Sequence, residues 1–207
     1  MVAAGSKDIS FIVLLAGTGV PGNEILLLQQ ELIGRANGAS EAELLKSKLM
    51  NKGAFDIIIN TVDNSKRKAD LSTYLNQVYE QDTTLEIPQG MTKDELISKQ
   101  VSQLTSPWMV YFITHDPAPV LQKVKCAVLA VNGDKDLQVP AQVNLDAIKK
   151  ALEKGGNKKV TTRVFPGLNH LFQECKTGSP SEYAGIEQTI SPAVLQEVTQ
   201  WIVKQTK

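Results

Sequence analysis

Two loops of the sequence carry side chains suited to proton transfer. Asp136 stands in Val131–Pro140 (VNGDKDLQVP), directly after an apolar run typical of a buried strand. His170 stands in Phe165–Phe172 (FPGLNHLF), at the same end of the next expected strand. Loops at the carboxyl ends of neighbouring parallel strands share one edge of a sheet, where ligand sites gather. We therefore expect Asp136 and His170 to meet, and a histidine beside a carboxylate is suited to acid–base chemistry.

The elements that must position these loops alternate between strand and helix. Apolar runs predict buried strands at Ile9–Leu15 and Cys126–Val131, and we predict a third strand at Val160–Phe165. Apolar residues at helical spacing predict helices at Asn23–Arg35, Gln142–Lys154 and Ile190–Lys204. Because strands that alternate with helices pair in parallel through right-handed crossovers, the sequence predicts a small parallel sheet of about three strands.

The stretch between the first and second strands is helical in character. Phe55–Ile59 is rich in β-branched residues, which favour strands, but its apolar positions also share one helical face, and we predict a helix. Thr92–Glu95 has the pattern of a capped helix start. The sequence thus predicts an α/β fold with a core at 1–21 and 117–207 and a helical cap insertion at 22–116.

Taken together, the two loops resemble those of a known family. Gly133–Pro140 (GDKDLQVP) after one strand, followed by Phe165–His170 (FPGLNH) after the next, resembles the acid and histidine loops of α/β-hydrolases, closest to esterase and acyl-peptidase-like members. The resemblance extends to Ser106-Pro107-Trp108 and to the final helix with Trp201, and it spans nearly the whole chain. It implies a truncated α/β-hydrolase-like fold, the C-terminal half with its cap helices.

The resemblance also implies roles for the two residues. Asp136 would orient the imidazole and stabilise its cation, and His170 would take the proton of a nucleophile as general base. Asp134 is the less suited acid, because its place after Gly133 favours turn hydrogen bonds. The family's nucleophile elbow, Gly-x-Ser-x-Gly, precedes the acid in chain order, and this motif is absent. Only about eight residues precede the first strand, too few for the missing strands.

Other serines and the second histidine lack the context of a catalytic residue. Gly38–Ala42 looks like an elbow, but it follows a helical segment, and Ser40 fits a helix capping box instead. Ser6 and Ser106 have no positioned base beside them in the sequence pattern. His115 lies in the helical insertion, and we interpret it as a surface or packing residue.

The turn Gly17–Gly22 (GTGVPG) formally matches the dinucleotide-binding pattern Gly-x-Gly-x-x-Gly. Such a site needs an acidic residue at the end of a second strand about 20 residues later, whereas Glu41 and Glu43 follow no strand. Pro21 also removes one amide near the helix start. We interpret the turn as a strand-to-helix connection and keep dinucleotide binding as a lesser alternative.

Composition limits the classes of partner. Of 207 residues, 42% are hydrophobic and 21% charged, and the net charge of +0 gives no attraction for nucleic acid or an anionic membrane. Cys126 and Cys175 lack metal-ligand spacing and are expected to be reduced packing residues, so we expect no metal and no cofactor. No secretory signal is recognisable, which favours a cytoplasmic protein.

Three functions are consistent with these observations. The first is a carboxylesterase-type hydrolase of small esters that uses Asp136, His170 and an unidentified nucleophile. The second is a catalytically inactive hydrolase half that serves in binding or assembly, and the third is dinucleotide binding. Truncation would leave one edge of Ile9–Leu15 bare, so we expect a homo-oligomer formed through this strand.

Overall fold

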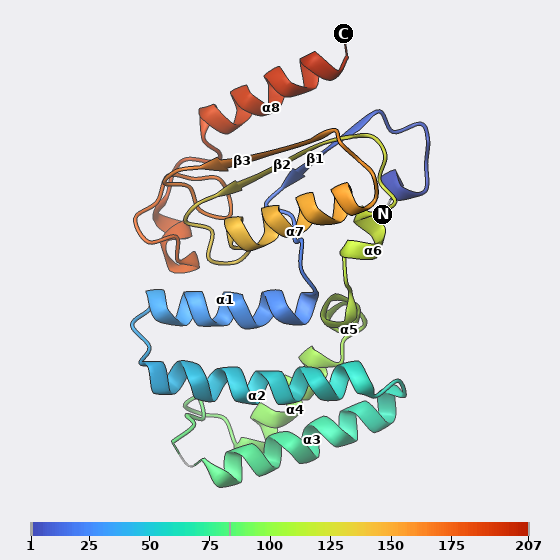
Figure 1. Ribbon diagram of the computed structural model, residues 1–207. Coiled ribbons are helices and arrows are strands. Elements are labelled where there is room, and N and C mark those ends of the chain that lie inside the picture. Colours follow the sequence, from blue (N-terminus) through green and yellow to red (C-terminus); the bar gives the residue numbers. More distant parts are fainter. Residues whose placement is uncertain (1, 83, 207) are drawn as a thin grey trace. The chain divides into compact units, whose positions relative to one another are not determined.

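The three expected strands form a parallel sheet in the computed structural model, which describes residues 2–82 and 84–206. β1 (Phe11–Leu15), β2 (Ala127–Gly133) and β3 (Val160–Phe165) follow one another in the order β1-β2-β3 (Figure 1). β2 is buried along its whole length, as expected of a central strand between two neighbours. The predicted α/β fold with a three-stranded parallel sheet is therefore confirmed.

The helices of the described residues follow the periodic segments of the sequence. Their bounds are α1 (Gly22–Ala36), α2 (Glu41–Asn60), α3 (Asn64–Gln81), α4 (Lys93–Leu104), α5 (Pro107–Thr114), α6 (Ala118–Leu121), α7 (Ala141–Lys154) and α8 (Pro192–Gln205). Two short 3-10 helices are η1 (Val2–Ala4) and η2 (Pro180–Gly185). Phe55–Ile59 lies within α2, which confirms the helix prediction for that ambiguous stretch. In the described part of the chain, no helix has the length and apolarity that crossing a membrane requires.

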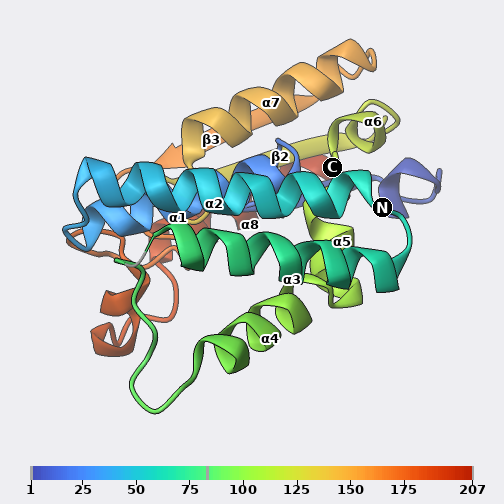
Figure 2. The ribbon, with the colours of Figure 1, turned by 90° about the horizontal axis from the view of Figure 1, so that it is seen from below.

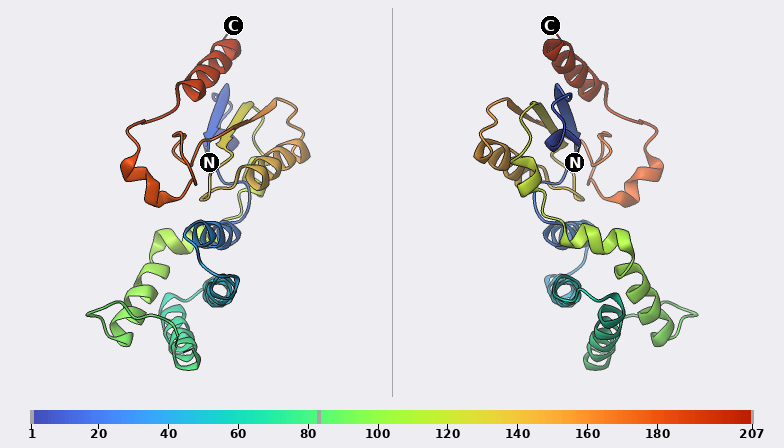
Figure 3. Two further views of the ribbon diagram at one scale, coloured as in Figure 1. Left: turned by 90° about the vertical axis from the view of Figure 1, so that its left-hand side faces the viewer. Right: turned by 90° about the vertical axis from the view of Figure 1, so that its right-hand side faces the viewer.

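The chain divides into two units, and the first, Met1–Ser40 with Asp116–Lys207, contains the sheet. Alternate residues of β2 point to opposite faces: Val128 and Ala130 pack in the cluster that includes α7, Leu129 and Val131 in the cluster that includes α8. Within this unit α7 and α8 accordingly lie on opposite faces of the strands (Figure 3). A strand with apolar neighbours on both faces explains the unbroken apolar run at this position.

The second unit, Glu41–His115, consists of α2, α3, α4 and α5. α3 packs between α2 and α4, as seen in Figure 2, and α5 packs on α2. The side chains that fill this unit are almost fully buried, among them Ala54, Phe55, Ile58, Leu71, Leu75, Ile97, Val101 and Ile113. The predicted cap at the start of α4 is present, because Thr92 and Glu95 exchange the two hydrogen bonds of a capping box.

The division differs from the predicted boundaries in the placement of α1. The insertion was expected to begin at residue 22, but α1 belongs to the unit that contains the sheet. Its Gln29 Nε2 donates to Gln138 Oε1 at 3.3 Å, and Asn37, at its C-terminal end, accepts from Ser179 at 3.0 Å. Ile25 is buried. Helical periodicity shows that a segment has an inner face, but not which unit that face contacts, so the sequence did not reveal this boundary.

β1 forms one edge of the sheet. Among the described residues it pairs only with β2, in a register that aligns Phe11 with Ala127 and Leu15 with Val131. Its five residues, FIVLL, include no charge and no proline, and Leu15 is 51% exposed. An apolar edge strand without such protective residues is able to pair with a further strand.

Candidate functional site

Asp136 lies in the turn that follows β2 at its carboxyl end. Its Oδ1 accepts hydrogen bonds from the amides of Gln138 and Val139, both at 2.8 Å. Its Oδ2 lies 2.8 Å from Nδ1 of His170, and the carboxyl side chain is completely buried. A buried carboxylate with three such partners is both satisfied and fixed in direction.

His170 lies in the turn that follows β3, and the structure brings it into the expected contact with Asp136. An ionised carboxylate only accepts hydrogen bonds, so the proton of this contact belongs on Nδ1 and the lone pair of the neutral ring on Nε2. The side chain is 28% exposed. No group among residues 2–82 and 84–206 forms a hydrogen bond with Nε2, which is thus free to accept a proton from elsewhere.

The two turns meet because their backbones approach closely. A Cβ atom at Gly133 would lie 2.1 Å from the carbonyl oxygen of Leu168, so only glycine fits there. The same carbonyl accepts from the amide of Lys135 at 3.0 Å. Asp134 Oδ1 accepts from the amide of Gly167 at 2.6 Å, which gives this residue the turn-stabilising role that its position suggested. The loops therefore hold one another independently of the Asp136–His170 contact.

Two buried asparagines shape the turns, and sequence reasoning missed both. Asn132 accepts from the amide of Gly133 at 2.9 Å and donates to the carbonyl of Val139 at 2.7 Å, which closes the acid turn. Asn169 accepts from the amides of Leu171 and Gln173, both at 2.9 Å, and so closes the histidine turn. Asparagine after a strand is a turn signal, and this was the sign available in the sequence.

A polar network beside the pair was also missed. Gln138 Nε2 donates to the hydroxyl of Tyr183 at 2.9 Å, and Gln138 Oε1 accepts from Gln29. Burial raises the pKa of Tyr183, and so does the nearby charge of Asp136, although the hydrogen bond from Gln138 acts in the opposite direction. Tyr183 belongs to η2, 45 residues beyond Gln138, and no local pattern links the two.

The other serines and the second histidine have local structural roles. Ser106 caps α5, since its Oγ accepts from the amide of Met109 at 3.3 Å. Ser6 accepts from Asp8 at 3.1 Å and precedes β1, whereas the Asp136 turn follows β2, so the two lie beyond opposite ends of the parallel sheet. Ser40 directly precedes α2. His115 ends α5, and its ring stacks on Tyr111 with centroids 5.1 Å apart.

The glycine turn after β1 is explained by packing. The amide of Gly19 donates to Asn144 Oδ1 at 2.8 Å, and a Cβ atom at this position would lie 2.3 Å from the carbonyl oxygen of Asn144. Asn144 is a fully buried residue of α7. The glycine is therefore required for close contact between this turn and α7, and its amide already has a partner.

The cysteines have no disulfide partner and are partly buried. Burial raises the pKa of both thiols, Cys126 and Cys175, which disfavours the nucleophilic thiolate form. Within the part of the chain that the structure describes, no three His, Cys, Asp or Glu side chains cluster as metal ligands would. Asp136 and His170 are therefore the side chains from which we infer chemistry at this site.

Comparison of the chain with models of known families and with curated proteins found no match. The deciding feature of the site is the imidazole of His170, which Asp136 holds on one side and which has no hydrogen-bond partner on the other side among the described residues.

Proposed function

We propose that this chain carries the acid–base pair of a carboxylic ester hydrolase of the α/β-hydrolase type. The proposal is supported by one observation above all, the 2.8 Å contact between His170 Nδ1 and Asp136 Oδ2 at the carboxyl edge of a parallel sheet. The chain order, acid before histidine on successive strands, agrees with that of the family that the two loops resemble.

In this mechanism His170 acts through Nε2. The lone pair of Nε2 takes the proton of a hydroxyl or water nucleophile while that oxygen forms a bond to the ester carbonyl. The ring is then a cation, which the adjacent carboxylate of Asp136 stabilises. When the tetrahedral intermediate collapses, Nε2 returns the proton to the leaving alkoxide. With water as the nucleophile the acid product is then free and the cycle is complete. With a hydroxyl side chain the acyl group stays on its oxygen until His170 activates a water molecule that releases it.

The nucleophile is the open part of the proposal. No hydroxyl side chain among residues 2–82 and 84–206 bonds to Nε2, so we assign no serine to this role. A water molecule activated by His170 satisfies the same proton balance. It reacts more slowly than a serine in a preorganised oxyanion site, because both the covalent step and the fixed donors are missing.

The test is hydrolysis of p-nitrophenyl acetate by the purified protein and by His170→Ala. We expect the variant to lose at least about 100-fold in kcat/KM, the scale of a general base. His115→Ala is the matched control, because it removes the other histidine, at the end of α5, and it should keep the activity. Equal hydrolysis by His170→Ala and the unmodified chain would remove the support for this function.

A second candidate is a noncatalytic assembly module, and two observations favour it. Nε2 of His170 has no nucleophile bonded to it in the described part of the chain, and the apolar strand β1 pairs on one side only. We infer that a second copy covers this edge, because antiparallel pairing of two β1 strands about a twofold axis satisfies both edges identically. Absence of turnover on ester, thioester and peptide substrates, together with a stable dimer, would favour this candidate.

A further inference from the structure

The hydroxyl of Tyr183 is hydrogen-bonded to the acid turn of the candidate site. It accepts from Gln138 Nε2 at 2.9 Å, and the amide of Gln138 donates to Asp136 Oδ1 at 2.8 Å. One phenolic oxygen thus holds the residue whose amide binds the carboxylate of Asp136.

Tyr183 is held in place from its own side by the start of η2. Ser179 caps η2, is almost fully buried, and donates to Asn37 Oδ1 at the end of α1 at 3.0 Å. Glu182, next to Tyr183, accepts from the amides of Thr177 and Gly178 at 3.0 and 3.3 Å. These bonds fix the helical turn from which the tyrosine ring projects.

A second tether joins this segment to the acid turn. Lys135, next to Asp136, donates through Nζ to the carbonyls of Cys175 and Lys176 at 3.1 and 2.8 Å. A Cβ atom at Gly178 would lie 2.0 Å from the carbonyl oxygen of Lys135, so the two backbones are in close contact. The segment before η2 therefore cannot shift without moving the acid turn.

We propose that Tyr183 is a positioning residue for the Asp136–His170 pair. Its hydroxyl fixes Gln138, the amide of Gln138 donates to Asp136 Oδ1, and the carboxylate of Asp136 in turn holds the imidazole at Nδ1. The effect on turnover rests on the proposed ester hydrolysis, whereas the effect on the imidazole does not. Tyr183→Phe leaves the ring in place but removes the acceptor of the Gln138 side-chain N–H, so the acid turn loses one of its constraints.

The first experiment needs no turnover. Nitrogen-15 NMR of the histidine rings at mildly alkaline pH reports which ring nitrogen carries the proton, and His115→Gln assigns the signals of His170, because the chain has two histidines. We expect the Nδ1-protonated form in the unmodified protein and, in Tyr183→Phe, signals displaced toward a mixture of both forms. Tyr79→Phe is the matched control, since the Tyr79 hydroxyl accepts from Gln100, in the helical unit. Unchanged His170 signals in Tyr183→Phe, or an equal displacement in Tyr79→Phe, would overturn the proposal.

The second experiment uses p-nitrophenyl acetate. A misdirected imidazole should lower kcat about 10-fold with little change in KM, because proton transfer and not binding is impaired. In a His170→Ala background, Tyr183→Phe should have no further effect. A full additional loss in that background would show that Tyr183 acts independently of His170. Absence of turnover in the unmodified chain would count against ester hydrolysis and leave the NMR result to decide the role of Tyr183.

Discussion

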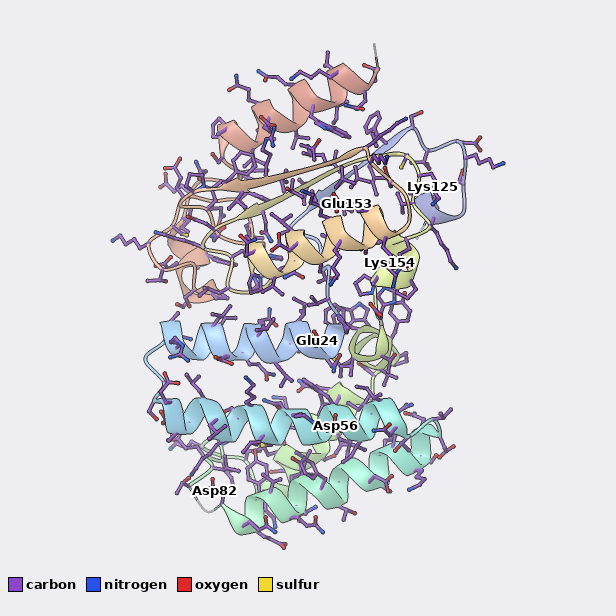
Figure 4. The ribbon with its side chains drawn as sticks, viewed as in Figure 1. Glu24, Asp56, Asp82, Lys125, Glu153 and Lys154 are labelled. Carbon is purple, nitrogen blue, oxygen red and sulfur yellow. The ribbon has the colours of Figure 1, made fainter. Side chains whose placement is uncertain are left out.

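The two ends of β2 use polar groups in opposite ways. At the amino end, buried Asn157 donates to the carbonyls of Val124 and Cys126 at 3.1 and 2.8 Å and accepts from the amide of Lys159 at 2.9 Å. Lys125, labelled in Figure 4, donates there to the carbonyl of Gly155. At the carboxyl end, Asp136 Oδ2 is hydrogen-bonded to His170 Nδ1, and among the described residues no group is hydrogen-bonded to His170 Nε2.

This difference separates structural from chemical use of polar side chains. Asn157 has all of its bonds within the protein, so its removal should affect stability and not reactivity. Among the described residues His170 is held at Nδ1 only, its side chain is 28% exposed, and a ring nitrogen without a partner is what a base needs. We expect substitutions at the carboxyl end of β2 to change activity and substitutions at its amino end to change stability.

The largest expected effect is on activity, at the carboxyl end. Asp136→Asn keeps the shape of the side chain but can present an amide donor to Nδ1, which forces the ring proton onto Nε2 and removes the base. We expect ester hydrolysis to fall at least about 100-fold while the protein stays folded. Asp134→Asn is the control in the same turn, because an amide oxygen can still accept from Gly167. Activity of Asp136→Asn within about twofold of the original would contradict the proposal.

The next effect is on stability, at the amino end. Asn157→Ala leaves two carbonyls and one amide without their partner, which should lower the free energy of unfolding by about 2 kcal/mol in urea titrations. Activity per folded molecule should be unchanged. The exposed Lys125 serves for comparison, and Lys125→Met should cost less than about 1 kcal/mol. A large loss of activity in folded Asn157→Ala would mean that the two ends are not independent.

The open edge of β1 gives a third prediction. Leu15→Lys places a charge at an exposed position of this strand, where pairing with a second copy would bring two charges together. If the chain forms a dimer through β1, light scattering should show a dissociation constant at least about 10-fold higher than that of the original protein. A monomer at micromolar concentration before any substitution would rule out this association. Val203→Lys, at an exposed position of α8, is the control.

The smallest expected effect concerns Glu182, in the segment that supports Tyr183. Desolvation acts to raise the pKa of Glu182, but bonds from Thr177, Gly178 and Lys176 outweigh it and hold the pKa below its ordinary value. A lowered native pKa means that the stabilisation is present above the ordinary pKa of glutamate and is lost as pH falls through the lowered value. The amide signal of Thr177 should titrate in that acidic range. Glu182→Gln should remove this titration, and Glu187→Gln should not.

The fold was predictable where a pattern is local. The run before Asn132 predicts a strand because both faces of β2 are covered, and Asp136 and His170 were found because each follows an expected strand by a few residues. That α1 belongs to the unit that contains the sheet was not predictable. Its place depends on hydrogen bonds such as that between Asn37 and Ser179, which are 142 residues apart. Periodicity carries no information about such contacts.

The site was predictable in its two reactive residues and not in their supports. Tyr183 contacts Gln138 from η2, a short 3-10 helix with no periodic apolar pattern, and its importance comes from the position of one oxygen. Asn169 is buried in the histidine turn, where its side chain accepts two hydrogen bonds from the backbone. The sequence indicates these bonds only through the general preference of asparagine for turns. Supporting residues such as Tyr183 and Asn169 are identified from the three-dimensional structure, because the sequence does not give their positions.

The contact at Gly19 has a mechanical consequence for the acid turn. Here the backbone of the turn after β1 rests directly against the backbone of α7 at Asn144, with no side chain between them. We expect this contact to restrict movement of α7 along its own axis. Because Val139 and Pro140 connect the acid turn directly to α7, the same restraint should help to fix the position of Asp136 at the edge of the sheet. We therefore expect Gly19→Ala to displace the carboxylate of Asp136.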